Sequence, residues 1–163
     1  MEGKIIYPYL PEGREILYVD ATNEFIAKAK EYAKQHSLDA VMPNATVIVR
    51  NQKILGVAAN GSNYHEKFPC KRIELKCKSG EGYEFCEGCS PKNHSEVKAI
   101  KDAHTKGHDT NGADLYLWGH WWFCKDCWSA IMHAGIKNTY LLKGSEELFN
   151  KDSPNNIVGK QFE

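Results

Sequence analysis

His94 and Glu96, followed about thirty residues later by Cys124 and Cys127, are residues whose types and spacing could do chemistry. Imidazole and thiolate are both good zinc ligands, and three protein ligands leave one tetrahedral position for water, whereas a structural site closes all four. Two thiolates and a neutral imidazole cancel the charge of Zn²⁺, so bound water can lose a proton near neutral pH. The pattern predicts a catalytic zinc held by His94, Cys124 and Cys127, with Glu96 free to carry protons. A structural zinc at the same residues is the alternative.

Both ligand groups are expected in first helical turns. Apolar residues follow at helical spacing: Val97, Ile100 and Ala103 after His94, and Ala130, Ile131 and Ala134 after Cys127. A helix N-terminus favours thiolates through its partial positive charge. Cysteines three apart share one helical face, so both sulfurs can reach one metal. We therefore expect helices from His94 to about residue 106 and over residues 125–134.

The pairing resembles the signature of the zinc-dependent nucleobase deaminases, H-x-E followed by P-C-x-x-C, in which the glutamate is the general acid and base. The chain is similar to the cytidine/deoxycytidylate deaminase superfamily, and within it to deoxycytidylate deaminases, over roughly residues 44 to 142. Outside the two motifs the likeness is carried by Gly112–Tyr116, Ala130–Lys137, Cys70–Arg72, Ser79–Gly80, Tyr83–Glu84 and Cys86.

Three departures from the family pattern surround the motifs. Ser95 stands where alanine is usual, and Phe123 stands where proline precedes the first cysteine. The loop over residues 116–124 is about one residue longer than the family's and far more aromatic. These departures bear on the choice of substrate more than on the chemistry.

The resemblance implies zinc-dependent hydrolytic deamination of a cytosine nucleotide, dCMP to dUMP with release of ammonia. Glu96 would take a proton from water and deliver protons to the ring nitrogen and to the leaving ammonia. Asn60 resembles the asparagine with which deoxycytidylate deaminases contact the substrate sugar, although an ordinary turn asparagine is the alternative. Trp121 and Trp122 would stack on the base or shape the pocket, unless they are core or subunit contacts. A polynucleotide deaminase acting on tRNA, RNA or single-stranded DNA, and a non-enzymatic zinc-stabilised binding module, are the alternative functions.

A second group of cysteines has the spacing C-x6-C-x8-C-x2-C: Cys70, Cys77, Cys86 and Cys89. Four thiolates would close a tetrahedral shell, and such a site stabilises a loop rather than activating water. We expect residues 64–92 to form a cysteine-rich insertion with a structural zinc. Free thiols are the alternative, and His65 could replace one cysteine as a ligand.

Composition limits the class of protein. A length of 163 residues with 42% hydrophobic residues suits a single domain spanning residues 1–163. Lysine plus arginine and aspartate plus glutamate number 21 each, so no global field attracts a polynucleotide, and a small nucleotide is the expected partner. The zero net charge also lowers repulsion between copies, which fits a homo-oligomer. No apolar run suits a membrane span or a signal peptide, so we expect a cytoplasmic protein whose cysteines bind metal rather than form disulfides.

The remaining elements follow from periodicity and turn residues. An apolar stripe predicts a helix from Thr22 to His36, after an extended N-terminal arm over residues 1–21. Strands are expected over residues 45–50, 54–59, 113–118 and 138–142, the first two forming a hairpin, and a short helix over residues 146–149. This alternation, together with the resemblance, predicts a three-layer α/β/α sandwich with a central mixed sheet of about five strands.

Overall fold

Five strands form one mixed sheet in the part of the chain that the computed structural model describes, residues 8–78 and 81–163. The strands are β1 (Ile16–Val19), β2 (Ala45–Arg50), β3 (Lys53–Ala59), β4 (Asp114–Trp118) and β5 (Asn138–Leu142), in the spatial order β1-β5-β4-β2-β3. The longer helices are α1 (Glu24–His36), α4 (Ser95–Thr105), α5 (Lys125–His133) and α6 (Ser145–Phe149). The strands and helices predicted from the sequence are confirmed within two residues at their ends.

The sheet is mixed because its two halves are connected differently. β2 and β3 form an antiparallel hairpin, and Asn51 and Gln52 between them both have positive φ, as a tight hairpin turn requires. β2 also runs antiparallel to β4, whereas β4 pairs in parallel with β5, and β5 pairs in parallel with β1. The crossover from β4 to β5 passes through α5, the usual connection between parallel strands.

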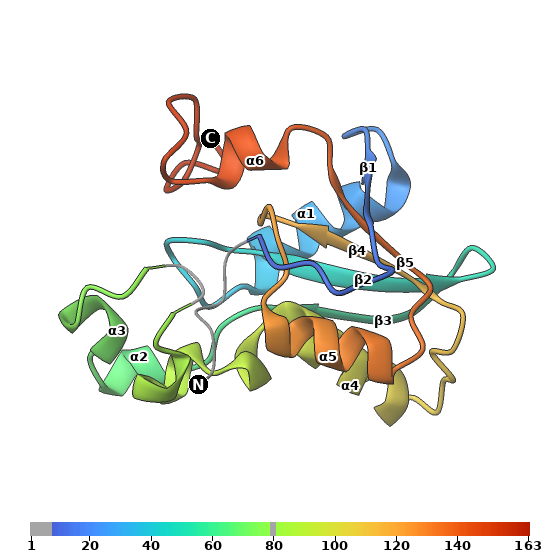
Figure 1. Cartoon of the computed structure of the whole chain (residues 1–163), viewed down its shortest axis with the longest axis horizontal. Helices are drawn as coiled ribbons and strands as arrows, with labels where there is room; N and C mark the ends of the chain where they lie inside the picture. Colours follow the sequence, from blue (N-terminus) through green and yellow to red (C-terminus); the bar gives the residue numbers. More distant parts are fainter. Residues whose placement is uncertain (1–7, 79–80) are drawn as a thin grey trace.

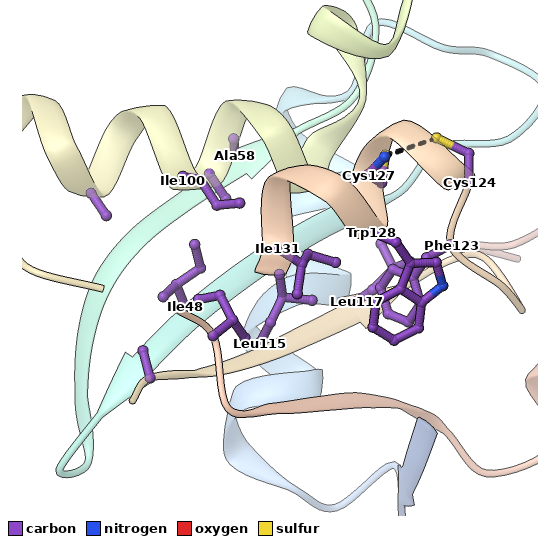
Figure 2. Packing of buried hydrophobic residues seen from close by; sticks show 14 of the residues in the cluster. Ile48, Ala58, Ile100, Leu115, Leu117, Phe123, Cys124, Cys127, Trp128 and Ile131 are labelled. Carbon is purple, nitrogen blue, oxygen red and sulfur yellow. Dashed lines mark hydrogen bonds between the residues drawn. The ribbon is translucent and has the colours of Figure 1, made fainter. Parts of the chain in front are cut away.

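Helices cover both faces of the sheet, which confirms the three-layer α/β/α arrangement. α4 and α5 lie side by side on one face, and α1 and α6 lie on the other (Figure 1). Successive strand residues alternate between the two cores: Ile48 packs under α4 and α5, and Val47 packs under α1. Figure 2 shows the first core, where Ile131 of α5 lies beside Leu115 of β4.

Helix α4 lies unusually close to β3. A Cβ atom at Gly56 would lie 2.5 Å from the carbonyl oxygen of Ala99 and 2.8 Å from Cβ of Ala103, so only glycine allows this contact. Ala99 and Ala103 are themselves fully buried. Small residues on both elements therefore set the distance of α4 from the sheet, and with it the position of the helix end that carries His94 and Glu96.

The fifth strand lies within the segment predicted as an N-terminal arm, of which residues 1–7 are outside the described residues. β1 pairs in parallel with β5, with Ile16 opposite Thr139. Nearby, Arg14 donates a hydrogen bond to the carbonyl oxygen of Ile136 at 3.0 Å. β1 therefore closes the edge of the sheet next to β5.

Where it is described, the cysteine-rich insertion consists of short helical turns: α2 (Tyr64–Lys67), α3 (Lys71–Glu74), η1 (Tyr83–Phe85), η2 (Glu87–Cys89) and η3 (Pro91–Asn93). It extends from one end of the sheet, and η3 leads directly into α4 (Figure 1). Four of its large apolar side chains are at least half exposed or close to it: Phe68, Ile73, Leu75 and Phe85. Within the described residues, no helix is both long and apolar enough to cross a membrane.

Candidate metal centre

His94, Cys124 and Cys127 lie together at the N-termini of α4 and α5. His94 is the N-cap residue of α4 and Cys124 that of α5. Nδ1 of His94 lies 3.5 Å from Sγ of Cys124 and 3.4 Å from Sγ of Cys127. One zinc ion bound to both would hold nitrogen and sulfur about 3.5 Å apart. The two sulfurs are 3.1 Å apart, which is the distance of a thiol donating to a thiolate rather than of two zinc-bound thiolates, about 3.8 Å apart.

The second ring nitrogen of His94 is held by the backbone. Nε2 lies 3.2 Å from the carbonyl oxygen of Cys89, which can only accept, so Nε2 carries a proton and Nδ1 is the nitrogen that faces the two sulfurs. Zinc-binding histidines generally donate their other ring N–H in this way, which fixes the tautomer and the ring orientation. The donor set and its tautomer therefore fit a zinc ion.

Electrostatics favour one thiolate here even without metal. The hydrogen bond with Cys127 lowers the pKa of Cys124 to about 6, with His94 lowering it further against the effect of burial. Sγ of Cys124 also accepts the backbone N–H of Cys127 at 3.3 Å, the dashed line in Figure 2. The same sulfur pair raises the pKa of Cys127, to which burial and the Glu96 carboxylate add. Burial lowers the pKa of His94, but the interactions with Cys124 outweigh it, so the net pKa is raised.

Glu96 lies in the first turn of α4 and is 5% exposed. Its Oε1 lies 2.9 Å from the Ser95 hydroxyl. The carboxylate also interacts with the Cys127 thiol, whose pKa it helps to raise. A buried carboxylate beside three metal-ligand atoms is the arrangement expected of a proton carrier.

A buried polar network supports this carboxylate. The Ser95 hydroxyl lies 2.8 Å from Oδ1 of Asn44 and 2.9 Å from the hydroxyl of Thr46. Asn44 and Thr46, both buried, were not predicted as site residues. The sequence does indicate a special role for Thr46, because it is a polar residue inside the apolar run of β2. The network links the sheet to the first turn of α4.

Asn60 is 7% exposed, and its side-chain amide already has hydrogen-bond partners within the protein. Oδ1 accepts hydrogen bonds from the Ser37 hydroxyl at 2.6 Å and from the backbone of Asn44 at 2.9 Å, while Nδ2 donates to the carbonyl oxygen of Met42 at 3.0 Å. Asn60 therefore organises the loop that precedes β2. Its contact with a substrate stays a prediction.

The aromatic loop after β4 is a packed wall. Trp122 is 3% exposed and Phe123 is fully buried, both in the core under α5, and Trp121 is half-buried. Nδ1 of His120 accepts the backbone N–H groups of Trp121 and Trp122, at 2.9 Å and 3.3 Å. Burial, helped by electrostatic interactions with His94 and Lys151, lowers the pKa of His120 to about 3, so its ring is neutral. Stacking of Trp121 or Trp122 on a base stays a prediction.

Three of the four cysteines of the insertion form a second group. The sulfurs of Cys70, Cys86 and Cys89 lie within 4.8 Å of one another, and those of Cys70 and Cys89 are 3.6 Å apart. Burial raises the pKa of Cys89 to about 12, although a hydrogen bond with Arg72 opposes it. Cys77 does not belong to this group; its sulfur lies against Gly82, where a Cβ atom would be 2.5 Å from it.

A family model described as the cytidine and deoxycytidylate deaminase zinc-binding region matches residues 20–143. No curated protein sequence matches the chain. Among solved structures, dCMP deaminase from the cyanophage S-TIM5 is 19% identical, with a TM-score of 0.48, over 74% of this chain and 82% of that one. Guanine deaminase from Bacillus subtilis is 21% identical, with a TM-score of 0.45, over 74% of this chain and 62% of that one.

A longer protein from Thermotoga maritima is also similar. It is a diaminohydroxyphosphoribosylaminopyrimidine deaminase/5-amino-6-(5-phosphoribosylamino)uracil reductase, 21% identical with a TM-score of 0.45 over 72% of this chain. The chain spans 28% of the length of that protein. The titles of these neighbours name different substrates, so the neighbours do not select one substrate for this chain.

Proposed function

We propose, from the premise that this chain belongs to the cytidine and deoxycytidylate deaminase zinc-binding family, that it deaminates a cytosine nucleotide hydrolytically, converting dCMP to dUMP with release of ammonia. The observation that carries the proposal is the group of three ligand atoms, from His94, Cys124 and Cys127, with the buried Glu96 beside it. Three protein ligands leave a tetrahedral position open for water, which a purely structural site would close.

Zinc held at these residues would supply one kind of chemistry, lowering the pKa of a water molecule towards 7. The protein supplies proton transfer. Glu96 takes the proton released by the water and delivers protons to the ring nitrogen and to the departing amino group. Its burial and its place two residues after His94 keep it close to both partners. The hydroxyl of Ser95 holds one of its oxygens in place.

A free nucleotide fits this chain better than a polynucleotide. The formal net charge is zero, so the protein has no overall field to gather phosphates along a strand. Trp122 is packed in the core rather than offered as a platform on which single-stranded bases stack. The steep salt dependence of oligonucleotide binding would identify the polynucleotide alternative.

A second, structural zinc in the insertion is part of the proposal. The three sulfurs of Cys70, Cys86 and Cys89 are the soft ligands that zinc prefers, and they gather in a segment with little apolar core of its own. A structural zinc here would need a fourth ligand beside these three sulfurs. Self-association and a cytoplasmic location stay predictions from the sequence.

Ammonia release from a panel of cytosine, adenine and guanine compounds tests the function, using protein whose zinc content has been measured. Each base is supplied free, as nucleoside and as monophosphate. We expect turnover of dCMP, and Glu96→Gln should keep its zinc while losing about 10²–10⁴-fold in kcat. Glu146→Gln is the matched control, because Glu146 also lies in the first turn of a helix but is exposed. Turnover of Glu96→Gln near the wild-type rate would refute the proton-transfer role, and turnover of another base alone would refute the substrate.

A further inference from the structure

We propose that Cys89 couples the two metal sites: its thiol belongs to the group in the insertion, and its carbonyl oxygen orients His94, so metal in the insertion sets the affinity of the catalytic site for zinc. The inference rests on the two zinc sites proposed above and not on the identity of the substrate. Both contacts come from one residue, which makes the coupling a property of a single turn of backbone.

The first step is that the insertion has few other means of holding its shape. Among the described residues between Tyr64 and Asn93, Cys86 is the only hydrophobic residue that is buried, with 2% exposure. Ile73 and Phe85 are 74% and 53% exposed. A segment without an apolar core needs cross-links, and three converging sulfurs can provide them through a metal.

The second step is the short connection from the sulfurs to the histidine. The backbone N–H of Cys89 donates to the carbonyl oxygen of Cys86 at 3.2 Å, which closes the turn η2. The carbonyl oxygen of Cys89 then accepts Nε2–H of His94 at 3.2 Å. Nδ2 of Asn93 donates back to the carbonyl oxygen of Glu87 at 3.0 Å. A shift of η2 therefore reaches the ring of His94 through direct hydrogen bonds.

The third step is that a side chain of the insertion also contacts the imidazole ring of His94. The ring of Tyr83 in η1 meets that of His94 edge-on, with centroids 4.9 Å apart. The guanidinium of Arg72 lies over the Tyr83 ring, 4.5 Å from its centroid. Arg72 also donates to the carbonyl oxygen of Glu81 at 2.8 Å. Two helical turns of the insertion, η1 and η2, therefore contact His94, and Cys86 of the sulfur group lies between them.

The expected size of the coupling follows from what such partners do elsewhere. Removing the group that accepts the second N–H of a metal-binding histidine costs about 10–100-fold in metal affinity. The backbone carbonyl of Cys89 cannot be removed by substitution. Loss of a metal bound to the Cys89 thiol would, however, leave this carbonyl free to move. By linkage, the effect is reciprocal: occupancy of the catalytic site strengthens the insertion site by the same factor.

The experiment compares Cys70→Ser with Cys77→Ser in the full chain. Cys70 belongs to the sulfur group and Cys77, in the same insertion, lies outside it. Zinc per chain is measured after dialysis, and the affinity of the catalytic site by competition with a chromophoric chelator. We expect about two zinc ions in the wild type and in Cys77→Ser. Cys70→Ser should keep about one, held about 10–100-fold more weakly.

Cys70→His is the conservative variant, since imidazole also binds zinc, and it should restore both the second zinc and the affinity of the first. Circular dichroism reports whether each variant folds, and the His variant keeps the test usable if the serine variant does not fold. Two zinc ions in Cys70→Ser, or one bound as tightly as in the wild type, would overturn the proposal. Loss of zinc from Cys77→Ser would overturn the assignment of the sulfur group. None of these measurements depends on turnover, so a failed substrate panel leaves the inference standing.

Discussion

Ser95→Ala is the substitution that tests how the chain holds Glu96, the proposed proton carrier. The Ser95 hydroxyl is fully buried and has three neighbours: Oε1 of Glu96 at 2.9 Å, Oδ1 of Asn44 at 2.8 Å and the Thr46 hydroxyl at 2.9 Å. A hydroxyl has one hydrogen, so Ser95 donates to one of the two acceptors and receives a hydrogen bond from Thr46. Alanine removes both of these hydrogen bonds.

The cost follows from the groups left behind. Thr46 is 0% exposed and Asn44 7%, so neither can turn to water for a replacement partner. One unsatisfied buried donor or acceptor costs about 1–3 kcal/mol. We therefore expect Ser95→Ala to lower the free energy of unfolding by about 2–4 kcal/mol. Loss of the contact to Glu96 should also lower kcat about tenfold or more, because a small displacement of a reacting group is enough to do so.

Urea unfolding and steady-state ammonia release measure the two effects. Ser145→Ala is the matched control: Ser145 is also a buried first residue of a helix, and its hydroxyl donates to the carbonyl oxygen of Leu142. It should lose about 1 kcal/mol of stability with kcat unchanged. Thr46→Val combined with Ser95→Ala should be less destabilising than the sum of the single changes, by about 1 kcal/mol. A Ser95→Ala protein with both wild-type stability and wild-type kcat would refute the reasoning.

Three further substitutions test the scaffold by urea unfolding. Gly56→Ala should lower the free energy of unfolding by about 1–3 kcal/mol and reduce kcat, because its Cβ would lie 2.5 Å from the carbonyl oxygen of Ala99 and displace α4; unchanged values would contradict the packing. Trp128→Ala should cost about 3–5 kcal/mol, since Trp128 is 0% exposed, and a loss under 1 kcal/mol would contradict its place in the core. Burial raises the pKa of Asp102, but its interactions with Lys106 and a backbone N–H lower the net pKa. The carboxylate therefore stabilises the fold above the unfolded-state pKa, and this stabilisation is lost as pH falls through the folded-state pKa. Asp102→Asn should lower the free energy of unfolding by about 0.5 kcal/mol at pH 7, after allowance for solvent screening, and should not change it at pH 2.

The grouping of His94, Cys124 and Cys127 could be predicted because its signal is local. A Cys-x-x-Cys at a helix start places both sulfurs on one helical face whatever the rest of the fold does. The helices that carry His94 and Cys124 were also readable, because their apolar residues recur at helical spacing. Gly135, with φ of 74°, ends α5 as its position after the apolar stripe predicts.

Features made by contacts between distant segments could not be predicted. β1 has four residues and becomes a strand only by pairing with β5, near the other end of the chain. Cys77 matches the spacing of a four-thiol site, but it lies outside the sulfur group that the fold assembles. Spacing shows which residues could bind together, and the path of the backbone decides which do.

Asn44 and Asn60 show what this difference means for function. Asn60 resembles an asparagine that contacts the substrate sugar in deoxycytidylate deaminases, yet its oxygen accepts hydrogen bonds from Ser37 and from the backbone of Asn44. Nothing in the sequence indicates a role for Asn44 in the site, yet its side-chain oxygen lies beside the Ser95 hydroxyl, which also contacts Glu96. Asn60 therefore acts on the site through Asn44, and substituting it should disturb the placing of Glu96 as well as any contact with a sugar. The residues proposed to carry out the reaction lie in two short motifs, whereas their positions depend on asparagines whose partners lie on other elements.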